Sequence, residues 1–502
     1  MPKISELFLH CPALLRPRGA FADAEISDLV TDSRAAKAGS AFVCLKGWIA
    51  DGHAYAASAY ENGCRCFLCE EPLALPPDAL QIRLPDTRAA LPYLASAFYG
   101  APERNLLLVG ITGTKGKTTV ACLLYELLQK CGVPCGLIGT TGIRYATNSF
   151  QSNNTTPDGL RLAQIFSQMV RCGIKIVIME VSSQAFLSHR VDALHFDMAI
   201  YTNLSADHIG QHEHPSFENY KHCKQMLFSM CDFAVLNRDD AYYADFAAKC
   251  RCPIQSYGFS ADADFHITPQ NDGGSAFTLT ENDQSYRVPF SMPGSFNMQN
   301  AAAVLCAAKH LGIPPAQAAP LLGSCTVPGR FEQIEGLDGV RCIIDYAHNG
   351  ASMESVLRCV RAQNPGRIVV LYGSVGSRTE LRREELGTVC ASLADFSILT
   401  ADNPDFEDPE KICWEIASFY DRQDAYCIIP DRKEAIEYAV AHAKKGDWLL
   451  FLGKGHESYQ IVRGKKEPFC ERDIIRAAIA KRNTSSKTTQ KQDTKTKGTV
   501  SI

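Results

Sequence analysis

A glycine-rich segment that carries two lysines and several threonines gives this sequence its clearest chemical feature. Residues 112–119 read Thr-Gly-Thr-Lys-Gly-Lys-Thr-Thr, between an apolar run at 106–111 and a stretch with apolar residues at helical spacing. A strand, a glycine turn and a helix start surround an anion with backbone N–H groups and the positive end of the helix dipole. Lys117 would add positive charge at the outer phosphates, and Thr118 a hydroxyl for Mg²⁺. A strict phosphate loop has glycine where Ile111 stands, but the flanking elements favour an ATP or GTP site over a chance turn.

Two further polar segments contain residue types that suit a metal ion bound to a nucleotide. Glu180 ends the apolar run 174–179, and the carboxyl end of a buried parallel strand is where open α/β sheets bind ligands. A carboxylate at that position can hold Mg²⁺. Residues 207–214 contain three histidines, which in isolation would suggest zinc. They lie in a loop-like stretch without cysteine partners nearby, so we expect one histidine on Mg²⁺ or phosphate instead.

The last third of the chain repeats one pattern, in which a strand-like run precedes a polar cluster. The strand-like runs occupy residues 340–344, 367–372, 396–399 and 448–452. The clusters that follow contain Asp345, Gly373, Asp402 and Gly453. Candidate helices lie between the runs, and this spacing is typical of a doubly wound parallel sheet with its ligand crevice along the carboxyl ends of the strands. The predicted fold class is α/β.

Length and turn-rich boundaries predict three domains and a tail. A chain of 502 residues is too long for one hydrophobic core, and turn residues at 99–102 mark a boundary. We expect an N-terminal domain at 1–100, a central domain at 101–332 and a C-terminal domain at 333–482. Residues 483–502 are rich in Ser, Thr, Lys and Gln and almost free of apolar residues, which predicts a disordered tail.

The composition excludes several classes of protein. A hydrophobic content of 46%, a charged content of 21% and a net charge of −4 are ordinary for a soluble globular protein and give no footprint for nucleic acid. The 21 cysteines are scattered along a large chain, which favours reduced thiols over a disulfide framework. The N-terminus lacks a basic segment followed by an apolar one, and no run is long enough for a membrane span. We therefore expect a cytoplasmic protein.

Taken in order, these segments resemble the motifs of the Mur ligases over residues 20–480. Besides the glycine-rich loop, the matching motifs are Asn-Thr-Thr-Pro (154–157), Glu-Val-Ser-Ser (180–183), Thr-Asn-Leu-Ser-Ala-Asp-His (202–208), Gly-Ser-Phe-Asn-Met-Gln-Asn-Ala (294–301), Pro-Gly-Arg-Phe (328–331), Asp-Tyr-Ala-His-Asn (345–349), Asp-Asn-Pro (402–404) and Gly-Lys-Gly-His-Glu (453–457). The resemblance implies a UDP-sugar-binding N-terminal domain, a central phosphate-loop ATPase domain and a Rossmann-like C-terminal domain that binds an amino acid. It is strongest to members that add the third residue to UDP-N-acetylmuramoyl-L-Ala-D-Glu.

The resemblance also implies a mechanism and a set of ATP-side residues. ATP would phosphorylate the substrate carboxylate, and the amine of a diamino acid would attack the acyl phosphate and release phosphate, with ADP as the other product. The catalytic residues would be Lys117, Glu180, His208 and Lys224, with Thr118, Glu180, His208 and a carbamylated Lys224 (N6-carboxylysine) around Mg²⁺. ATP would meet Gly113, Thr114, Lys115, Gly116, Lys117, Thr118, Thr119, Asn297, Asn300, Arg330, Asp345 and His348.

Two more groups of residues match substrate-binding positions of the family. Those for the UDP-sugar are Ser33, Thr155, Thr156, Ser182, Ser188 and Arg190. Those for the incoming amino acid are Arg378, Asp402, Asn403, Asp405, Gly453 and Glu457. The family usually has asparagine where Lys115 stands and glutamine where Ser188 stands.

One departure from the family concerns the amino acid that is added. Members that add meso-diaminopimelate have Asp-Asn-Pro-Arg, and this chain has Asp405 in place of that arginine. A carboxylate facing the distal carboxylate of diaminopimelate would be repelled, whereas the ammonium of lysine would be attracted. We therefore expect L-lysine in preference to meso-diaminopimelate, unless Arg378, Arg382 or Arg383 supplies the missing cation.

Two other functions remain open from the sequence. A folylpolyglutamate synthase-like ligase shares the loop and the ligase chemistry but lacks the N-terminal unit that Thr-Asp-Ser-Arg at 31–34 suggests. A non-catalytic nucleotide-binding regulator would not need Lys117, Glu180, His208 and Lys224 together. As partners we expect the two substrates and no nucleic acid, with the chain acting as a monomer.

Overall fold

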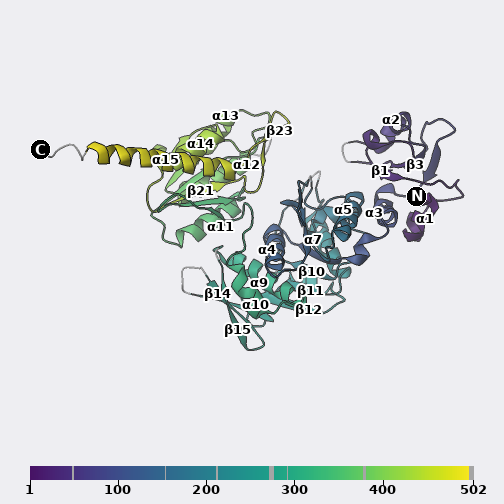
Figure 1. Cartoon of the computed structure of the whole chain (residues 1–502), viewed down its shortest axis with the longest axis horizontal. Coiled ribbons are helices and arrows are strands. Elements are labelled where there is room, and N and C mark those ends of the chain that lie inside the picture. The colour runs from purple at the N-terminus through teal and green to yellow at the C-terminus, as the bar shows by residue number, and fades with distance from the viewer. Residues whose placement is uncertain are drawn as a thin grey trace. The chain divides into compact units, whose positions relative to one another are not determined.

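The computed structural model describes residues 1–47, 50–152, 154–207, 209–210, 213–270, 276–290, 292–376 and 380–496, without the side chains of Glu380 and residues 485–496. The chain divides into two compact units (Figure 1). The first unit contains residues 1–268, 278–287 and 299–322, and the second contains 269–277, 288–298 and 323–502. No helix among the described residues is long and apolar enough to cross a membrane.

The first unit begins with a small parallel sheet in the order β1-β2-β3-β4. Its strands are β1 (Asp28–Val30), β2 (Ser40–Val43), β3 (Cys66–Cys69) and β4 (Leu80–Arg83). Alternate residues of these strands enter two hydrophobic clusters, one on each face. One face packs on α3 (Thr87–Phe98), whose Leu91, Leu94 and Ala95 share a cluster with Leu160 and Ala163 of α5 (Gly159–Arg171). This packing joins the small sheet to the rest of the first unit.

An eleven-stranded sheet in the order β15-β14-β13-β12-β11-β10-β5-β9-β6-β7-β8 forms the centre of the chain. Its strands are β5 (Leu107–Thr112), β6 (Cys135–Gly139), β7 (Gly142–Tyr145), β8 (Asn148–Phe150), β9 (Ile176–Glu180), β10 (Met198–Tyr201), β11 (Ala234–Asn237), β12 (Ile254–Gly258), β13 (Phe265–Pro269), β14 (Ala276–Glu281) and β15 (Gln284–Pro289). β5 pairs in parallel with β9 and β10, so their carboxyl ends lie side by side. The helices of this region are α4 (Lys117–Lys130), α5, α6 (Ser183–Leu187), α7 (Phe217–Gln225), α8 (Tyr243–Ala247), α9 (Ser295–His310) and α10 (Pro315–Leu322).

The second unit contains a doubly wound sheet in the order β16-β17-β21-β18-β19-β20. Its strands are β16 (Glu332–Ile334), β17 (Arg341–Asp345), β18 (Arg367–Tyr372), β19 (Phe396–Leu399), β20 (Tyr426–Ile428) and β21 (Asp447–Leu452). Only the β16–β17 pair among them is antiparallel. A hairpin of β22 (Tyr459–Val462) and β23 (Lys465–Pro468) follows. The structure and the fold class predicted from the sequence agree.

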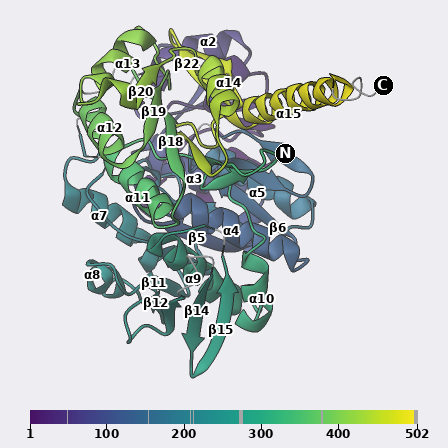
Figure 2. The ribbon, with the colours of Figure 1, turned by 90° about the vertical axis from the view of Figure 1, so that its left-hand side faces the viewer.

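Helices cover both faces of this sheet, which explains why its strands read as continuous apolar runs. Ile368 and Val370 face α11 (Gly350–Arg361), α12 (Glu380–Leu393) and α13 (Pro409–Ala417), whereas Val369 and Leu371 face α14 (Arg432–His442) and α15 (Glu471–Thr496). Figure 2 shows these two groups of helices on opposite sides of β18, β19 and β20. Because β17, β18, β19 and β21 run parallel, the carboxyl ends of β17, β19 and β21 lie at the same edge of the sheet.

The end of the described chain differs from the sequence prediction. A disordered tail was expected over 483–502, but α15 continues to Thr496. Ile475, Ala478 and Ile479 anchor the helix in the core, and the side chain of Asn483 donates to the carbonyl of Gly336 at 2.9 Å. Once a helix is nucleated by packing, each further residue adds one hydrogen bond, which extends it beyond its apolar segment.

Candidate active site

The glycine-rich loop joins β5 to α4, as the sequence predicts, and its shape depends on two glycines. Gly113 and Gly116 have φ values of 148° and 87°. A Cβ at Gly113 would collide with the Thr202 hydroxyl, and one at Gly116 would lie 2.6 Å from Asn300 Oδ1. The tight turn of the loop at the N-terminus of α4 therefore requires glycine at both positions.

Two residues directly after β10, Thr202 and Asn203, hold this loop in place, and no role was predicted for them. Asn203 Oδ1 accepts from Lys115 N at 3.0 Å, and Asn203 Nδ2 and Thr202 Oγ1 donate to Lys115 O at 3.1 and 2.6 Å. Their signal in the sequence is a polar pair directly after the apolar run of β10 (Met198–Tyr201). A polar pair at that point indicates a ligand-proximal turn.

Lys117 and Lys224 converge on one carbonyl of the loop. Lys117 Nζ donates to Gly113 O at 2.8 Å and to Thr114 O at 3.0 Å, and Lys224 Nζ donates to Gly113 O at 2.7 Å. Lys224, on α7, is 1% exposed, and its neighbour Tyr220 donates to Thr114 Oγ1 at 3.1 Å. Burial, and secondarily the charge of Lys117, hold the pKa of Lys224 well below its usual value. Lys224 is therefore part of the loop's surroundings and not an exposed helix lysine.

Glu180 lies at the carboxyl end of β9, next to the loop after β5. Its carboxylate accepts from Thr118 Oγ1 at 2.9 Å, from Thr140 N at 2.8 Å and from Thr140 Oγ1 at 3.1 Å. It is 1% exposed, and these three donors are neutral groups, so they do not compensate a negative charge. A hydroxyl and a carboxylate are hard oxygen ligands, and this donor set fits Mg²⁺. Thr140 was not predicted.

The histidine-rich segment can be assessed only in part. His208, predicted as a metal ligand, lies outside the described residues. His214 is buried, with Nε2 2.8 Å from Ser183 Oγ and Nδ1 2.7 Å from Asn219 Oδ1. Both ring nitrogens are thus engaged by protein atoms, which join the starts of α6 and α7.

Most of the residues predicted for the UDP-sugar gather beside Glu180. Thr156 Oγ1 donates to Glu180 O at 2.9 Å and accepts from Ser182 N at 3.0 Å, and Arg190 Nη1 donates to Thr156 O at 2.8 Å. Thr155 Oγ1 lies 3.1 Å from Thr140 Oγ1, and Ser188 is buried after α6. Ser33 belongs to the turn after β1, where its carbonyl accepts from Asn62 Nδ2 at 2.9 Å.

The remaining residues predicted for ATP lie on α9 and in the second unit. Asn297 and Asn300 are buried on α9, and Asn297 Nδ2 donates to Pro293 O at 2.8 Å. Arg330 stacks on Tyr346, 4.5 Å from the ring centroid. Asp345 accepts from Phe331 N and Ala347 N at 2.7 and 2.8 Å, and burial raises its pKa. Burial lowers the pKa of His348, whose Nδ1 lies 2.9 Å from Tyr346 O.

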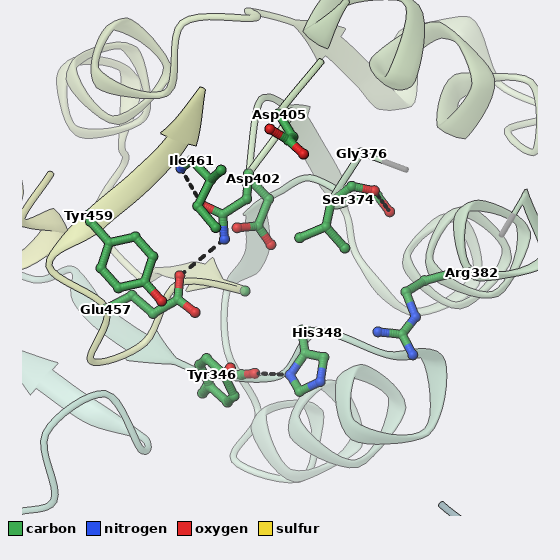
Figure 3. A pocket seen from close by; sticks show the side chains of 13 residues that line it. Tyr346, His348, Ser374, Gly376, Arg382, Asp402, Asp405, Glu457, Tyr459 and Ile461 are labelled. Atoms are coloured by element: carbon green, nitrogen blue, oxygen red, sulfur yellow. Dashed lines mark hydrogen bonds between the residues drawn. The ribbon is translucent and has the colours of Figure 1, made fainter. Parts of the chain in front are cut away.

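A pocket opens at the carboxyl edge of the second unit's sheet (Figure 3). Five of the six residues predicted for the amino acid line it: Asp402, Asn403, Asp405, Gly453 and Glu457. The sixth, Arg378, lies outside the described residues. The lining also includes residues that were not assigned to the amino acid, namely Tyr346, His348, Ser374, Val375, Gly376, Arg382, Tyr459 and Ile461. Buried Asp402 has a raised pKa because of desolvation, an effect that nearby Lys454 opposes.

Asp405 has a role in holding the backbone that was not predicted from the sequence. Its Oδ1 accepts from Gly464 N at 2.7 Å, and its own backbone bonds to Ile461 O at 3.0 Å and Arg463 N at 2.8 Å. One oxygen of the carboxylate therefore holds the turn of the β22–β23 hairpin.

The two arginines on α12 have different surroundings. Arg383 is buried and ion-paired with Glu407 at 2.7 Å and with Glu415, so its charge is already matched. Arg382 lines the pocket, and Figure 3 shows its guanidinium on the side of His348. Arg382 is thus the described arginine that is placed to meet an anionic group in the pocket.

Comparisons with known proteins agree with this geometry. Three family models match the chain: "Mur ligase family, catalytic domain" over 25–99, "Mur ligase middle domain" over 111–308 and "Mur ligase, glutamate ligase domain" over 329–455. A UDP-N-acetylmuramoyl-L-alanyl-D-glutamate–2,6-diaminopimelate ligase of Geobacillus kaustophilus is 37% identical over 96% of this chain and 100% of its own length. The enzyme of the same name from Chlorobaculum tepidum is 37% identical over 95% and 97%. A solved structure of such a ligase is 28% identical, with a TM-score of 0.67 over 91% of this chain and 95% of its own.

Proposed function

The chain belongs to the Mur ligase family, and from this premise we propose that it joins meso-diaminopimelate to UDP-N-acetylmuramoyl-L-alanyl-D-glutamate. It is an ATP-dependent, ADP-forming ligase of peptidoglycan synthesis that adds a diamino acid to this UDP-sugar dipeptide. The finer proposal, the identity of the diamino acid, is carried by one observation. Asp402, Glu457 and Arg382 line the same pocket, so it offers carboxylates for ammonium groups and a guanidinium for a carboxylate.

The expectation of L-lysine is corrected by the relatives, which are named for 2,6-diaminopimelate. The charge argument considered Asp405 by itself, whereas its Oδ1 is bonded to Gly464 N and the same pocket also contains Arg382. L-Lysine has no distal carboxylate for Arg382 to bind, whereas meso-diaminopimelate has one. Arg382 would therefore take the role that the arginine of Asp-Asn-Pro-Arg has in the family.

The reaction proposed is formation of an acyl phosphate followed by attack of the amine. The loop N–H groups and Lys117 would bind the ATP phosphates, and Thr118 and Glu180 would hold Mg²⁺, which supplies charge neutralisation for phosphoryl transfer. Asp402, Asn403 and Glu457 would hold the amino acid while its free amine reaches the acyl carbon. The chain's residues act by binding and orienting, without a protein nucleophile.

The test is ADP formation with the UDP-sugar dipeptide and meso-diaminopimelate, L-lysine or L-ornithine. We expect kcat/KM for meso-diaminopimelate to exceed that for L-lysine by at least about tenfold, roughly 1.4 kcal/mol. Arg382→Gln should lose about tenfold or more with meso-diaminopimelate and little with L-lysine. The matched control is Arg358→Gln, an exposed arginine on α11, which should change neither. A wild type that prefers L-lysine would refute the proposal.

The same assay addresses the two alternatives. Both named relatives extend over at least 95% of the chain, including the N-terminal sheet, which favours a UDP-sugar substrate over a folate. A folylpolyglutamate synthase-like enzyme would release ADP with a folate and glutamate and not with the UDP-sugar dipeptide. A regulator would bind ATP and release no ADP with any of these substrates.

We also propose that Lys224 carries a carbamate. Its buried amine beside Lys117 is held neutral more easily than an exposed one, and a neutral amine adds CO₂ with loss of one proton. Labelled bicarbonate should give a carbamate resonance in the wild type. Lys224→Ala should lack this resonance and should lose nearly all turnover. Lys221→Ala, on the same helix but paired with Glu218 and Asp245, should keep both. An unlabelled, fully active wild type would contradict the proposal.

The domain boundaries at 100 and 332 remain proposals, supported by the family matches over 25–99, 111–308 and 329–455. The proposal of a cytoplasmic location is supported by 21 cysteines, all present as free thiols in the described part of the chain. Sedimentation equilibrium tests the proposal that the chain is a monomer, and a mass of two chains would reject it.

A further inference from the structure

Lys454 is a buried lysine with no part in the steps described above. Its side chain is 0% exposed, and it is not among the residues that line the pocket. Its Nζ donates to Asn403 Oδ1 at 2.9 Å and to Glu457 Oε2 at 2.7 Å, and lies 3.7 Å from Asp402 Oδ1. All three of these partners do line the pocket. Lys454 therefore acts on the pocket only through other side chains.

Lys454 fixes which way the Asn403 amide faces. Asn403 Oδ1 accepts from Lys454 Nζ and from Ile461 N, each at 2.9 Å, while Nδ2 donates to Glu457 Oε2 at 3.2 Å. A flipped amide would lose both donors to its oxygen and set its NH₂ group against them. In the orientation observed, Nδ2 has a second hydrogen for a ligand.

Lys454 also leaves one oxygen of Glu457 to the pocket. Glu457 Oε2 accepts from Lys454 and from Asn403, whereas Oε1 has no hydrogen bond to the described residues. Figure 3 shows the Glu457 carboxylate among the lining side chains, and one of its oxygens accepts from Asn403 Nδ2 at 3.2 Å. The second oxygen is a free acceptor.

The charges of this cluster suit a cationic group of the substrate. Asp402 and Glu457 carry two negative charges when ionised, and Lys454 carries one positive charge, so the cluster has a net charge of −1. Without the lysine, two partly desolvated carboxylates would repel each other and draw protons. Lys454 opposes the rise in the pKa of Asp402 that burial causes, and an ammonium of the substrate would add a second positive charge to the cluster.

We infer that Lys454 is the positioning residue of the amino-acid subsite. It holds Asn403 and Glu457 so that Nδ2–H and Oε1 present a donor and an acceptor to the carboxylate and ammonium at one end of the incoming amino acid. This inference rests on the proposed function and deepens it. Lys454 should affect the binding of the amino acid and not the binding of the other two substrates. Its replacement should therefore change one KM value out of three.

The experiment compares Lys454→Met with the wild type in the full-length enzyme. KM for the amino acid should rise by at least about tenfold, while KM for ATP and for the UDP-sugar dipeptide stays within about twofold. The acidic limb of the pH profile for the amino acid should move to higher pH in the variant, because only Arg432 and His348 then oppose the rise in the pKa of buried Asp402. Lys454→Arg should raise the KM for the amino acid less than Lys454→Met does. Lys411→Met replaces an exposed lysine on α13 and should behave as the wild type.

The outcomes separate this inference from the proposed function. The KM values are measured with whichever amino acid the wild type uses, so a preference for L-lysine would refute the proposed substrate and still test Lys454. Equal changes in all three KM values, or no change in any, would overturn the inference. If neither Lys454→Met nor Lys454→Arg yields a folded enzyme, Lys454 is a folding residue only and the inference is also overturned.

Discussion

Glu180 is buried among three neutral hydrogen-bond donors, so one substitution can test the role of its negative charge. Glu180→Gln keeps the shape of the side chain and an oxygen that accepts from Thr140 N, and it removes the negative charge. Because that charge is the one offered to Mg²⁺, we expect kcat/KM to fall by about two orders of magnitude and the Mg²⁺ requirement to rise. The measurement is ADP formation over a range of Mg²⁺ concentrations. Glu126→Gln, on α4, is the matched control and should retain wild-type activity.

The buried side chain of His348 should make the stability of the second unit depend on pH. Burial lowers its pKa, an effect that Arg382 and Arg330 increase and that Tyr346 O and Asp402 oppose. As pH falls through the ordinary range of imidazole, the unfolded chain binds a proton that the folded chain refuses. The stability contributed by neutral His348 is therefore complete above the ordinary pKa and is lost as pH falls below it.

The check is urea unfolding between about pH 7.5 and about pH 5.5, the range in which an ordinary histidine titrates. His348→Gln, which can still donate to Tyr346 O, should lose less stability than the wild type over that range. Parallel losses in the two proteins would show that other groups cause the pH dependence.

At the residue level, sequence reasoning brings residues together where a motif fixes both residue type and chain position. Lys117 and Thr118 begin α4, the next element after β5, and Glu180 ends β9, which pairs with β5, so Thr118 Oγ1 reaches the Glu180 carboxylate. It failed where the outcome depends on distant chain segments. Asp405 looked like a free charge because its partner, Gly464 N, is 59 residues further along.

At the level of elements, α14 and α15 begin with a buried ion pair. Arg432 and Glu471 are both 0% exposed, with Arg432 Nη2 2.8 Å from Glu471 Oε1. Arg432 also donates to Ala401 O at 3.2 Å and to Leu452 O at 2.8 Å, directly before Asp402 and Gly453. The pair therefore fixes the ends of β19 and β21 from which the pocket loops start.

Removing one partner of this pair should destabilise the second unit strongly. Arg432→Met leaves Glu471 buried without its cation, and we expect a loss of about 3–5 kcal/mol in the free energy of unfolding. The double variant Arg432→Met with Glu471→Met leaves no buried charge and should recover part of that loss. Chemical denaturation of the three proteins gives the comparison. A double variant less stable than the single one would show that the hydrogen bonds of Arg432 matter more than its charge.

The apolar strands that were predicted agree with the structure to within one or two residues. The runs at 367–372 and 396–399 coincide with β18 and β19, because strands covered on both faces are apolar at every position. The antiparallel edges β7, β8 and β14–β15 were not predicted, since their alternating residues give a weaker signal. The extension of α15 beyond residue 483 was not predicted. A polar composition indicates that a segment does not pack in the core, but it does not show whether a preceding helix continues through it.

At the level of the whole molecule, the second unit has a core of its own. Its two hydrophobic clusters use only residues between Phe331 and Ile479, from the six strands and from α11 to α15. The residues that line the pocket, from Tyr346 to Ile461, lie in the same stretch. A chain with separate cores is expected to unfold in more than one step.

The last prediction follows from that separation. A fragment of residues 327–496 contains every member of both clusters and should fold alone, with a cooperative thermal transition that matches one step in the full-length chain. A shorter fragment that ends at 470 lacks α15, and with it Ile475, Ile479 and the partner of Arg432. It leaves one face of the sheet partly bare and a buried guanidinium unpaired, so it should not fold. Circular dichroism melting of both fragments and calorimetry of the full-length chain make the comparison. A 327–496 fragment that melts without cooperativity would mean that its core depends on contacts from the first unit, and the domain boundary proposed at 332 would then have to be abandoned.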